Sequence, residues 1–230
     1  MIAPAVSATF LPQTRCWVCD GSRLSRFHEA RFDFDEYRRQ DPELSQYSGC
    51  TVWLVRCGAC GFGQPEALPT LPRFFERMYD QRWSVEWIES ECDAAYKDLI
   101  FETILAQLER RVPRDAERRL LDVGAHVGRF MQMAQRVGWT VEGIEVNPTT
   151  ASCAERRTSS TVHRRPITSV AEGGRRFTAL TLTDVLEHIP DPVAVLRSAA
   201  ALLVPGGVVA VETFLREHRR RLAVAHVARR

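Results

Sequence analysis

Two closely spaced pairs of cysteines could bind one metal ion. Cys16 and Cys19 are separated by two residues, and so are Cys57 and Cys60, with glycine close behind each pair. Two thiolates at this spacing can bind one ion from a tight turn, and two such turns complete a tetrahedral zinc site with four cysteine ligands. The alternative is four unrelated buried or redox-active thiols. Because paired CxxC units in a reducing compartment are typical of metal sites, the sequence predicts zinc.

A loop with two glycines, followed by an acid, could bind a nucleoside. The segment LLDVGAHVGRF, residues 120–130, has the pattern of a buried strand, a loop and the start of a helix. Glycine lets a ligand approach the backbone, and a helix N-terminus offers N–H groups. Glu145 lies 21 residues after Gly124, where a strand-end carboxylate can accept both ribose hydroxyls. The alternative for Glu145 is a surface side chain without a ligand.

The loop differs from the dinucleotide-binding fingerprint G-x-G-x-x-G. His126 and Arg129 stand where that fingerprint requires glycine. Its second glycine makes room for a pyrophosphate, so its absence argues against a nicotinamide or flavin cofactor. The pattern suits an adenosine ligand that carries no phosphates.

Alternating strands and helices must position these groups. The sequence predicts a Rossmann-like, doubly wound α/β sheet of about five strands, preceded by a small zinc-binding module. A helix over 94–111 carries apolar residues at helical spacing, and Asp191-Pro192 marks the start of a later helix. The expected strands are 120–123, 140–146, a weak one at 161–163, 177–183 and 208–213.

Prolines and composition suggest four segments along the chain. Pro65, Pro69 and Pro72 mark the first boundary. The expected segments are a zinc-binding module at 1–68, a helical connector at 69–113, the sheet domain at 114–213 and an Arg-rich tail at 214–230.

Length and charge restrict the partners that we expect. The chain has 230 residues, 45% of them hydrophobic, and a net charge of +2. This balance gives no general attraction to nucleic acid or membrane, and no apolar run approaches the length of a membrane span. The N-terminus lacks the basic and apolar regions of a signal peptide, so we expect a cytoplasmic protein. The tail could instead be a basic arm for nucleic acid.

Four motifs in one order carry a family resemblance. LLDVGAHVGRF, GIEVNP, TLTDVLEHIPDP and LLVPGGVVAVET, between about residues 118 and 213, resemble class I S-adenosylmethionine-dependent methyltransferases. The whole chain also resembles a bacterial subgroup with an N-terminal four-cysteine zinc module, which includes sugar C-methyltransferases and enzymes of surface-polysaccharide and natural-product pathways. The resemblance implies S-adenosylmethionine and zinc as cofactors, and a sugar or a glycan or natural-product precursor as acceptor. The alternatives are an RNA methyltransferase and a truncated cofactor-binding remnant without activity.

The resemblance also implies residue roles. It assigns cofactor contacts to Asp122, Gly124, Ala125, His126, Gly128, Glu145, Asp184, Val185 and Leu186. His126 replaces the usual middle glycine of the loop. His188, in a Glu-His pair after the fourth strand, could act as general base because imidazole titrates near neutral pH. The alternative is a structural histidine that caps the turn.

The C-terminal tail departs from the family pattern. The family sheet has seven strands, and its last two form an antiparallel hairpin, whereas only 17 residues follow the fifth strand here. The tail, FLREHRRRLAVAHVARR, has a helix-like pattern through Leu215, Leu222 and Val224. We therefore expect a truncated chain with an incomplete sheet, an open edge on the fifth strand, and cofactor binding rather than turnover.

Overall fold

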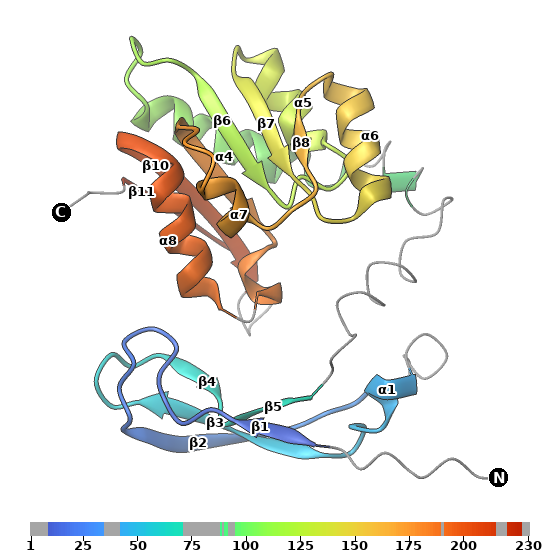
Figure 1. Cartoon of the computed structure of the whole chain (residues 1–230), viewed down its shortest axis with the longest axis vertical. Coiled ribbons are helices and arrows are strands. Elements are labelled where there is room, and N and C mark those ends of the chain that lie inside the picture. The colour runs from blue at the N-terminus through green and yellow to red at the C-terminus, as the bar shows by residue number, and fades with distance from the viewer. Residues whose placement is uncertain are drawn as a thin grey trace. The chain divides into compact units, whose positions relative to one another are not determined.

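Two units divide the chain, Met1–Ser84 and Val85–Arg230 (Figure 1). The computed structural model describes residues 9–34, 42–70, 88, 90–91, 95–189, 191–214 and 220–226. Much of the predicted connector at 69–113 therefore lies outside the described residues. None of the helices in the described ranges combines the length and apolar character that a membrane span requires.

The first unit is built from short antiparallel strands. β2 (Leu24–Arg31), β3 (Thr51–Cys57) and β4 (Gly63–Pro65) form one sheet, and β1 (Phe10–Pro12) pairs with β5 (Ala67–Pro69). A one-turn helix, α1 (Pro42–Ser45), precedes β3. The buried Tyr47 places its hydroxyl 2.8 Å and 2.9 Å from the carbonyl oxygens of Thr9 and Thr70. These bonds tie the chain just before β1 to the chain just after β5.

The second unit contains a six-stranded sheet in the order β11-β10-β9-β6-β7-β8. Its strands are β6 (Arg119–Val123), β7 (Thr140–Ile144), β8 (Val162–His163), β9 (Phe177–Thr183), β10 (Leu203–Phe214) and β11 (Arg220–His226). The strands from β8 to β10 are parallel, whereas β11 runs antiparallel to β10. The predicted α/β fold with five parallel strands is confirmed.

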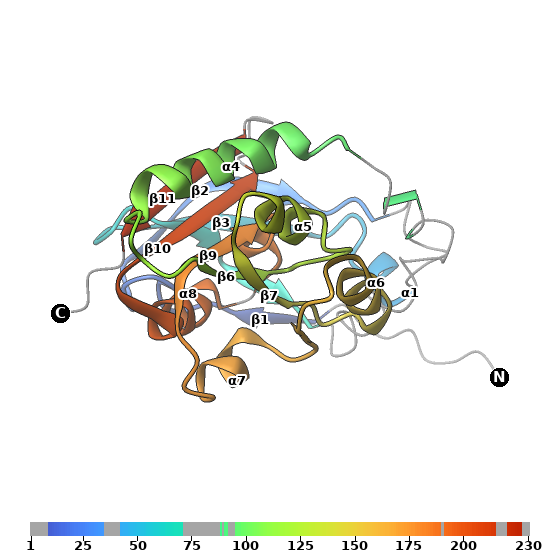
Figure 2. The same ribbon diagram turned by 90° about the horizontal axis from the view of Figure 1, so that it is seen from above.

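Helices cover both faces of this sheet (Figure 2). α4 (Asp98–Arg111), α5 (Arg129–Arg136) and α6 (Pro148–Thr158) share a core cluster on one face. α7 (Ile167–Ala171) and α8 (Pro192–Leu202) contribute to the cluster on the other face. β9 is buried along nearly its whole length, as expected for a parallel strand covered on both sides.

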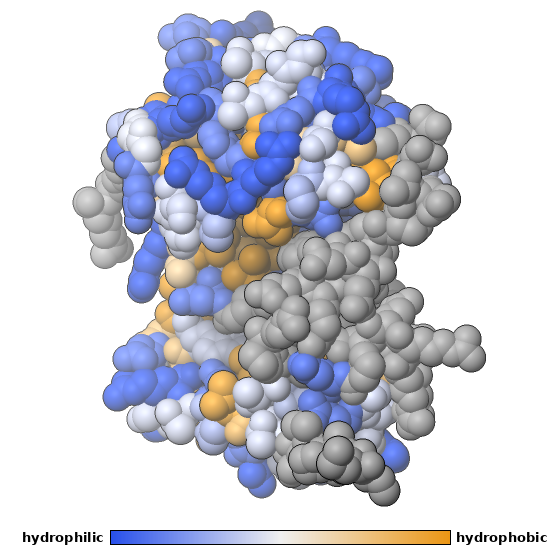
Figure 3. Space-filling model, turned by 45° about the vertical axis from the view of Figure 1, so that its right-hand side comes forward, coloured by the Kyte–Doolittle hydropathy of each residue, from blue (hydrophilic) through white to orange (hydrophobic). Residues whose placement is uncertain are grey.

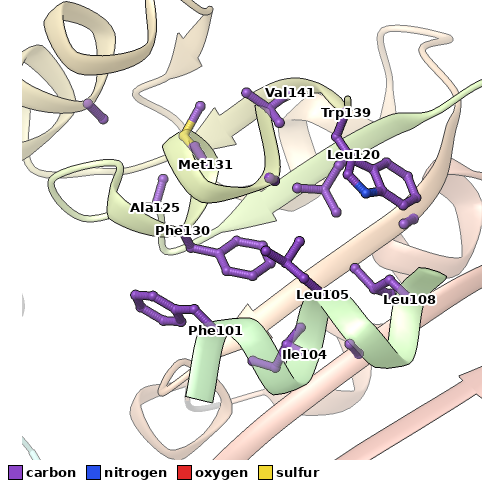
Figure 4. Close-up of a cluster of buried hydrophobic side chains, with 14 of the residues drawn as sticks. Phe101, Ile104, Leu105, Leu108, Leu120, Ala125, Phe130, Met131, Trp139 and Val141 are labelled. Carbon is purple, nitrogen blue, oxygen red and sulfur yellow. The ribbon is translucent and has the colours of Figure 1, made fainter. Parts of the chain in front are cut away.

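The apolar stripe of α4 packs as its spacing predicts. Phe101, Ile104 and Leu108 face the sheet, and the Phe101 ring meets Phe130 edge-on, 5.4 Å between centroids (Figure 4). The predicted start of α8 is also confirmed, because the Asp191 side chain accepts a hydrogen bond from the backbone N–H of Ala194. Residue spacing within each helix thus predicts which side meets the sheet and where the helix begins.

The prediction of a helical tail is wrong. Residues 220–226 form β11, which pairs with β10 from Phe214↔Arg220 to Val208↔His226. The outer edge of β10 presents a row of backbone N–H and C=O groups, and pairing satisfies them. This tertiary demand outweighs the helix preference of the Leu-, Ala- and Arg-rich segment. β11 covers this edge of β10, so the expectation of an open edge on the fifth strand is also wrong.

Candidate functional site

The four predicted cysteine ligands come together in the first unit. Cys16 Sγ lies 3.5 Å from Cys60 Sγ, Cys19 Sγ lies 3.6 Å from Cys57 Sγ, and all four sulfurs lie within 4.8 Å of one another. A tetrahedral ion with Zn–S bonds of about 2.3 Å separates its sulfurs by about 3.8 Å. The sulfur positions therefore fit a single zinc ion.

The two cysteine turns have the same backbone hydrogen bonds. In each turn, the carbonyl of the first cysteine accepts from the N–H four residues later, and its own N–H donates to the carbonyl five residues later. The bonds are Asp20 N to Cys16 O, Cys16 N to Gly21 O, Gly61 N to Cys57 O and Cys57 N to Phe62 O. Asp20 and Gly61, at equivalent positions, both have left-handed backbone, with φ of 60° and 75°. Glycine takes this conformation easily, and aspartate is among the side chains that tolerate it.

Backbone amides favour the metal-binding form of one thiol. The N–H groups of Cys60 and Ala59 hydrogen-bond to the sulfur of Cys57 and lower the pKa of this thiol to about 6. The thiolate is the form that binds metal.

In the second unit, the predicted cofactor residues gather at the carboxyl ends of β6, β7 and β9. The backbone N–H groups of Gly124 and Ala125 both donate to the carbonyl of Ile144, at the end of β7. Gly124 has φ +78°, and a Cβ there would lie 2.5 Å from Val185 Cγ2. Val185, after β9, therefore packs directly on the glycine of the β6–α5 loop. Both residues are among the predicted cofactor contacts, and the structure brings them together.

Gly128 allows a close contact between the start of α5 and α6. Its φ is +76°, and a Cβ at this position would lie 2.8 Å from the Ala154 Cα, which belongs to α6. The absence of a side chain lets the start of α5 rest on α6.

Glu145 is buried and held in one orientation. The side chain is 8% exposed, and Oε2 accepts from the His126 backbone N–H at 2.9 Å, whereas Oε1 accepts from the Asn147 backbone N–H at 2.8 Å. Burial raises the pKa of this carboxyl, and the hydrogen bonds oppose that shift. Asn147 in turn caps α6 by accepting from the backbone N–H of Thr149 and Thr150. The carboxylate thus joins the glycine loop to the next βα turn.

Asp122 lies inside the sheet. It is 3% exposed, and its Oδ1 accepts from the Thr181 hydroxyl on the neighbouring β9 at 2.7 Å. Burial, together with the charge of Glu145, raises the pKa of Asp122 to about 7. The described contact of this carboxyl is thus with a neighbouring strand.

His126 takes a backbone conformation typical of the glycine that it replaces. Its φ is +50°. Burial, with a smaller effect of the nearby Lys97 charge, lowers the pKa of His126 to about 4. The imidazole is therefore neutral at physiological pH.

The raised pKa of Asp122 and the lowered pKa of His126 predict opposite effects of pH on stability. The pKa of Asp122 is raised from 3.8 to about 7 on folding, so its contribution is fully present below pH 3.8 and is lost as the pH rises toward 7. Asp122→Asn keeps the acceptor for Thr181 and removes this loss. The free energy of unfolding of the variant, relative to the native protein, should increase by about 2 kcal/mol between pH 5 and 6.5 in denaturant titrations.

His126→Asn is the matched control for that measurement. Because the pKa of His126 falls on folding, the native protein loses stability as the pH drops from 6.5 toward 4. The relative stability of this variant should therefore increase toward acid, opposite to Asp122→Asn, and asparagine tolerates the left-handed backbone. If the relative stabilities of the two variants changed with pH in the same direction, the opposite pKa changes of Asp122 and His126 would be contradicted.

Two ion pairs at the start of α4 are not predicted by the sequence. Lys97 Nζ lies 2.5 Å from Asp184 Oδ2, after β9. The next residue, Asp98, accepts from the Arg129 guanidinium through Nε at 2.9 Å and Nη2 at 2.5 Å, at the start of α5. The Arg129 hydrogen bond also lowers the pKa of Asp98. Two consecutive side chains thus connect α4 to both loops that carry predicted cofactor residues.

Leu186 and His188 lie in a short 3-10 turn, Leu186–His188, at the same edge of the sheet. The His188 side chain is exposed, and its backbone N–H donates to the carbonyl of Val185 at 3.0 Å. The neighbouring Glu187 accepts from the Thr213 hydroxyl at 2.9 Å, at the end of β10.

Across the face in Figure 3, hydrophilic residues cover most of the coloured surface of the second unit.

Comparison with known proteins identifies a family for the segment that includes most of the second unit. Residues 77–229 match a family model described as a methyltransferase domain. The ubiquinone biosynthesis O-methyltransferase of Caulobacter sp. (strain K31) is 35% identical over 127 residues, which cover 51% of this chain and 50% of that protein. The enzyme of the same name from Xanthomonas campestris pv. campestris (strain B100) is 36% identical over 104 residues, 43% of this chain and 44% of the relative. The chain thus spans about half the length of the curated relatives that it matches.

A solved structure shares the fold. The plantazolicin methyltransferase BpumL in complex with SAH is similar to this chain with a TM-score of 0.53 and 11% sequence identity. The similarity covers 63% of this chain and 59% of that one.

Proposed function

This chain belongs to the methyltransferase domain family, and from that membership we propose that it transfers a methyl group from S-adenosylmethionine to a small molecule. The observation that carries the proposal is the buried, oriented carboxylate of Glu145 beside the glycine loop. The backbone N–H groups of His126 and Asn147 each bond to one oxygen, and the Thr150 hydroxyl and the Val146 N–H also hydrogen-bond to the carboxylate. A carboxylate oxygen has two lone pairs, so a carboxylate fixed at the end of β7 suits the two hydroxyls of a ribose.

The residues around Glu145 would divide the remaining tasks. S-adenosylmethionine, when bound, would supply an electrophilic methyl group on sulfur. Gly124 and Val185, which pack on each other, would form a wall beside the methionine part, together with Ala125 and Leu186. Lys97 neutralises Asp184, which limits the negative charge at this edge.

His188 is the proposed base. Its exposed imidazole would take the proton that a hydroxyl or amine of the acceptor loses as it bonds to the methyl carbon, while the bond from that carbon to the cofactor sulfur would break and leave S-adenosylhomocysteine. The protein would contribute mainly by holding the reacting atoms in line, because positioning accounts for much of the barrier in two-substrate reactions.

The proposed acceptor is a small molecule. The curated relatives are named as ubiquinone biosynthesis O-methyltransferases, which supports a hydroxyl-bearing acceptor. The whole chain, with its four-cysteine module ahead of the methyltransferase motifs, resembles a bacterial subgroup that includes sugar C-methyltransferases, so a sugar or a glycan or natural-product precursor is the acceptor that we propose.

We also propose that Cys16, Cys19, Cys57 and Cys60 bind one zinc ion. Four thiolates complete a tetrahedron and leave no open position for a substrate, so the role of this ion would be structural. The sulfur separations of 3.5 Å and 3.6 Å support this assignment.

The cofactor proposal can be tested by calorimetry with S-adenosylhomocysteine. Glu145→Gln removes the charge and turns an amide N–H₂ toward a backbone N–H, so affinity should fall by about 1–3 kcal/mol, or roughly 5- to 150-fold. Glu172→Gln, at an exposed position on the same unit, should bind like the native protein. Equal affinity of native protein and Glu145→Gln would remove the ribose role, and no binding by the native protein would overturn the proposed function.

A further inference from the structure

Gln64 links the two cysteine turns through both ends of its side chain. Its Oε1 accepts from the backbone N–H of Trp17, between the first two cysteines, at 2.9 Å. Its Nε2 donates to the carbonyl of Arg15 at 2.8 Å. The side chain is 2% exposed, so these bonds replace solvent on both sides of the carboxamide.

The bond to Trp17 has an equivalent on the other turn. The N–H that follows Cys57, that of Gly58, donates to the backbone carbonyl of Arg23 at 2.9 Å. Arg23 lies seven residues after Cys16, and Gln64 lies seven residues after Cys57. Each turn therefore donates one backbone N–H to the residue at the same position after the other turn. Arg23 uses its backbone for this bond, whereas Gln64 uses its side chain, so only the second bond depends on residue type.

We propose that Gln64 is the positioning residue of the metal site and holds the first cysteine turn in the geometry that metal binding requires. This inference rests on the zinc site proposed above. Without the carboxamide, the backbone N–H of Trp17 and the carbonyl of Arg15 lose the side chain that fixes them, at 2.9 Å and 2.8 Å, to the strand that follows the second cysteine turn. The first turn is then held less firmly against the second, and Cys16 and Cys19 can move with it. Residues that orient metal ligands typically contribute 10- to 100-fold to metal affinity.

Gln13 offers a matched control. Its Oε1 accepts from the indole Nε1 of the same Trp17 at 2.9 Å, but the bond does not involve the backbone of the cysteine turn. Gln64→Met and Gln13→Met are the same chemical change, and methionine keeps most of the side-chain volume. The pair separates a bond to the turn from a bond to the Trp17 side chain.

The experiment measures zinc affinity of the full chain by competition with a chromophoric chelator, and repeats it with Co²⁺ read by its thiolate absorption. Gln64→Met should bind zinc about 10- to 100-fold more weakly than the native protein. Gln13→Met should stay close to the native affinity. Gln64→Glu, which retains an acceptor for the Trp17 N–H, should lose less affinity than Gln64→Met. It also tests the inference if Gln64→Met fails to fold.

The outcomes separate this inference from the zinc proposal. Native protein that binds no zinc would overturn the site itself. Zinc binding by the native protein that is lost in Cys57→Ser, with unchanged affinity in Gln64→Met, would overturn the role of Gln64 alone. Equal losses in Gln64→Met and Gln13→Met would also overturn it, because a general loosening around Trp17 would then explain both.

Discussion

Gly128→Ala should lower the free energy of unfolding of the second unit by about 3 kcal/mol. The left-handed backbone at φ +76° costs an alanine about 1–2 kcal/mol. The new methyl group would also meet the Ala154 Cα at 2.8 Å, which is backbone rather than a flexible side-chain end, and overpacking of this kind costs about 1–3 kcal/mol. Either α6 moves away from α5 or the loop changes its path.

Gly206→Ala is the control for this prediction. Gly206 has nearly the same φ, +77°, but among the described residues beyond its chain neighbours no atom lies within 4 Å of an added Cβ. This variant should lose only about 1 kcal/mol in denaturant unfolding, which reports the backbone term by itself. Equal losses in the two variants would show that the contact with α6 contributes nothing.

Loss of the proposed zinc ion should have the largest effect on the first unit. Structural zinc binding contributes about 10–16 kcal/mol in small peptides, and in such sites this is also folding free energy. The described strands of the first unit are short, so chelation should abolish its cooperative unfolding transition and leave that of the second unit. Native protein should contain about one zinc per chain by elemental analysis, and Cys57→Ser should contain far less.

Cys50→Ser provides the comparison. Cys50 lies in the same unit but outside the four-sulfur cluster, so this variant should keep its zinc. Full zinc retention by Cys57→Ser, or equal loss in both variants, would contradict the assignment of ligands.

Local patterns in the sequence anticipate much of the fold. The run 177–183 predicts a strand, and β9 occupies the same residues. Asp191-Pro192 contains its own helix signal, because capping depends on residues within one turn. The spacing within each cysteine pair is also a local pattern, and it indicates the four sulfurs that the structure brings together.

Features that depend on distant residues could not be read in this way. The tail forms β11 because β10 offers it an edge, which a helix-favouring composition does not reveal. Lys97 and Asp184 are 87 residues apart, and nothing near either residue indicates the other. Gln64 looks like an ordinary polar residue until its two partners from the other cysteine turn are seen.

The two cysteine turns also close a long loop, and this affects how the first unit could vary. Cys19 and Cys57 are 38 positions apart, yet their sulfurs lie 3.6 Å from each other. The entropy of closing a loop grows only with the logarithm of its length, about 0.6 kcal/mol for each doubling. The two turns bond to each other through positions that directly follow them, so extra residues elsewhere in the loop need not disturb the sulfurs. Insertions between Arg31 and Thr51 that leave Tyr47 and its hydrogen bonds in place should therefore be tolerated, with the four sulfurs unchanged.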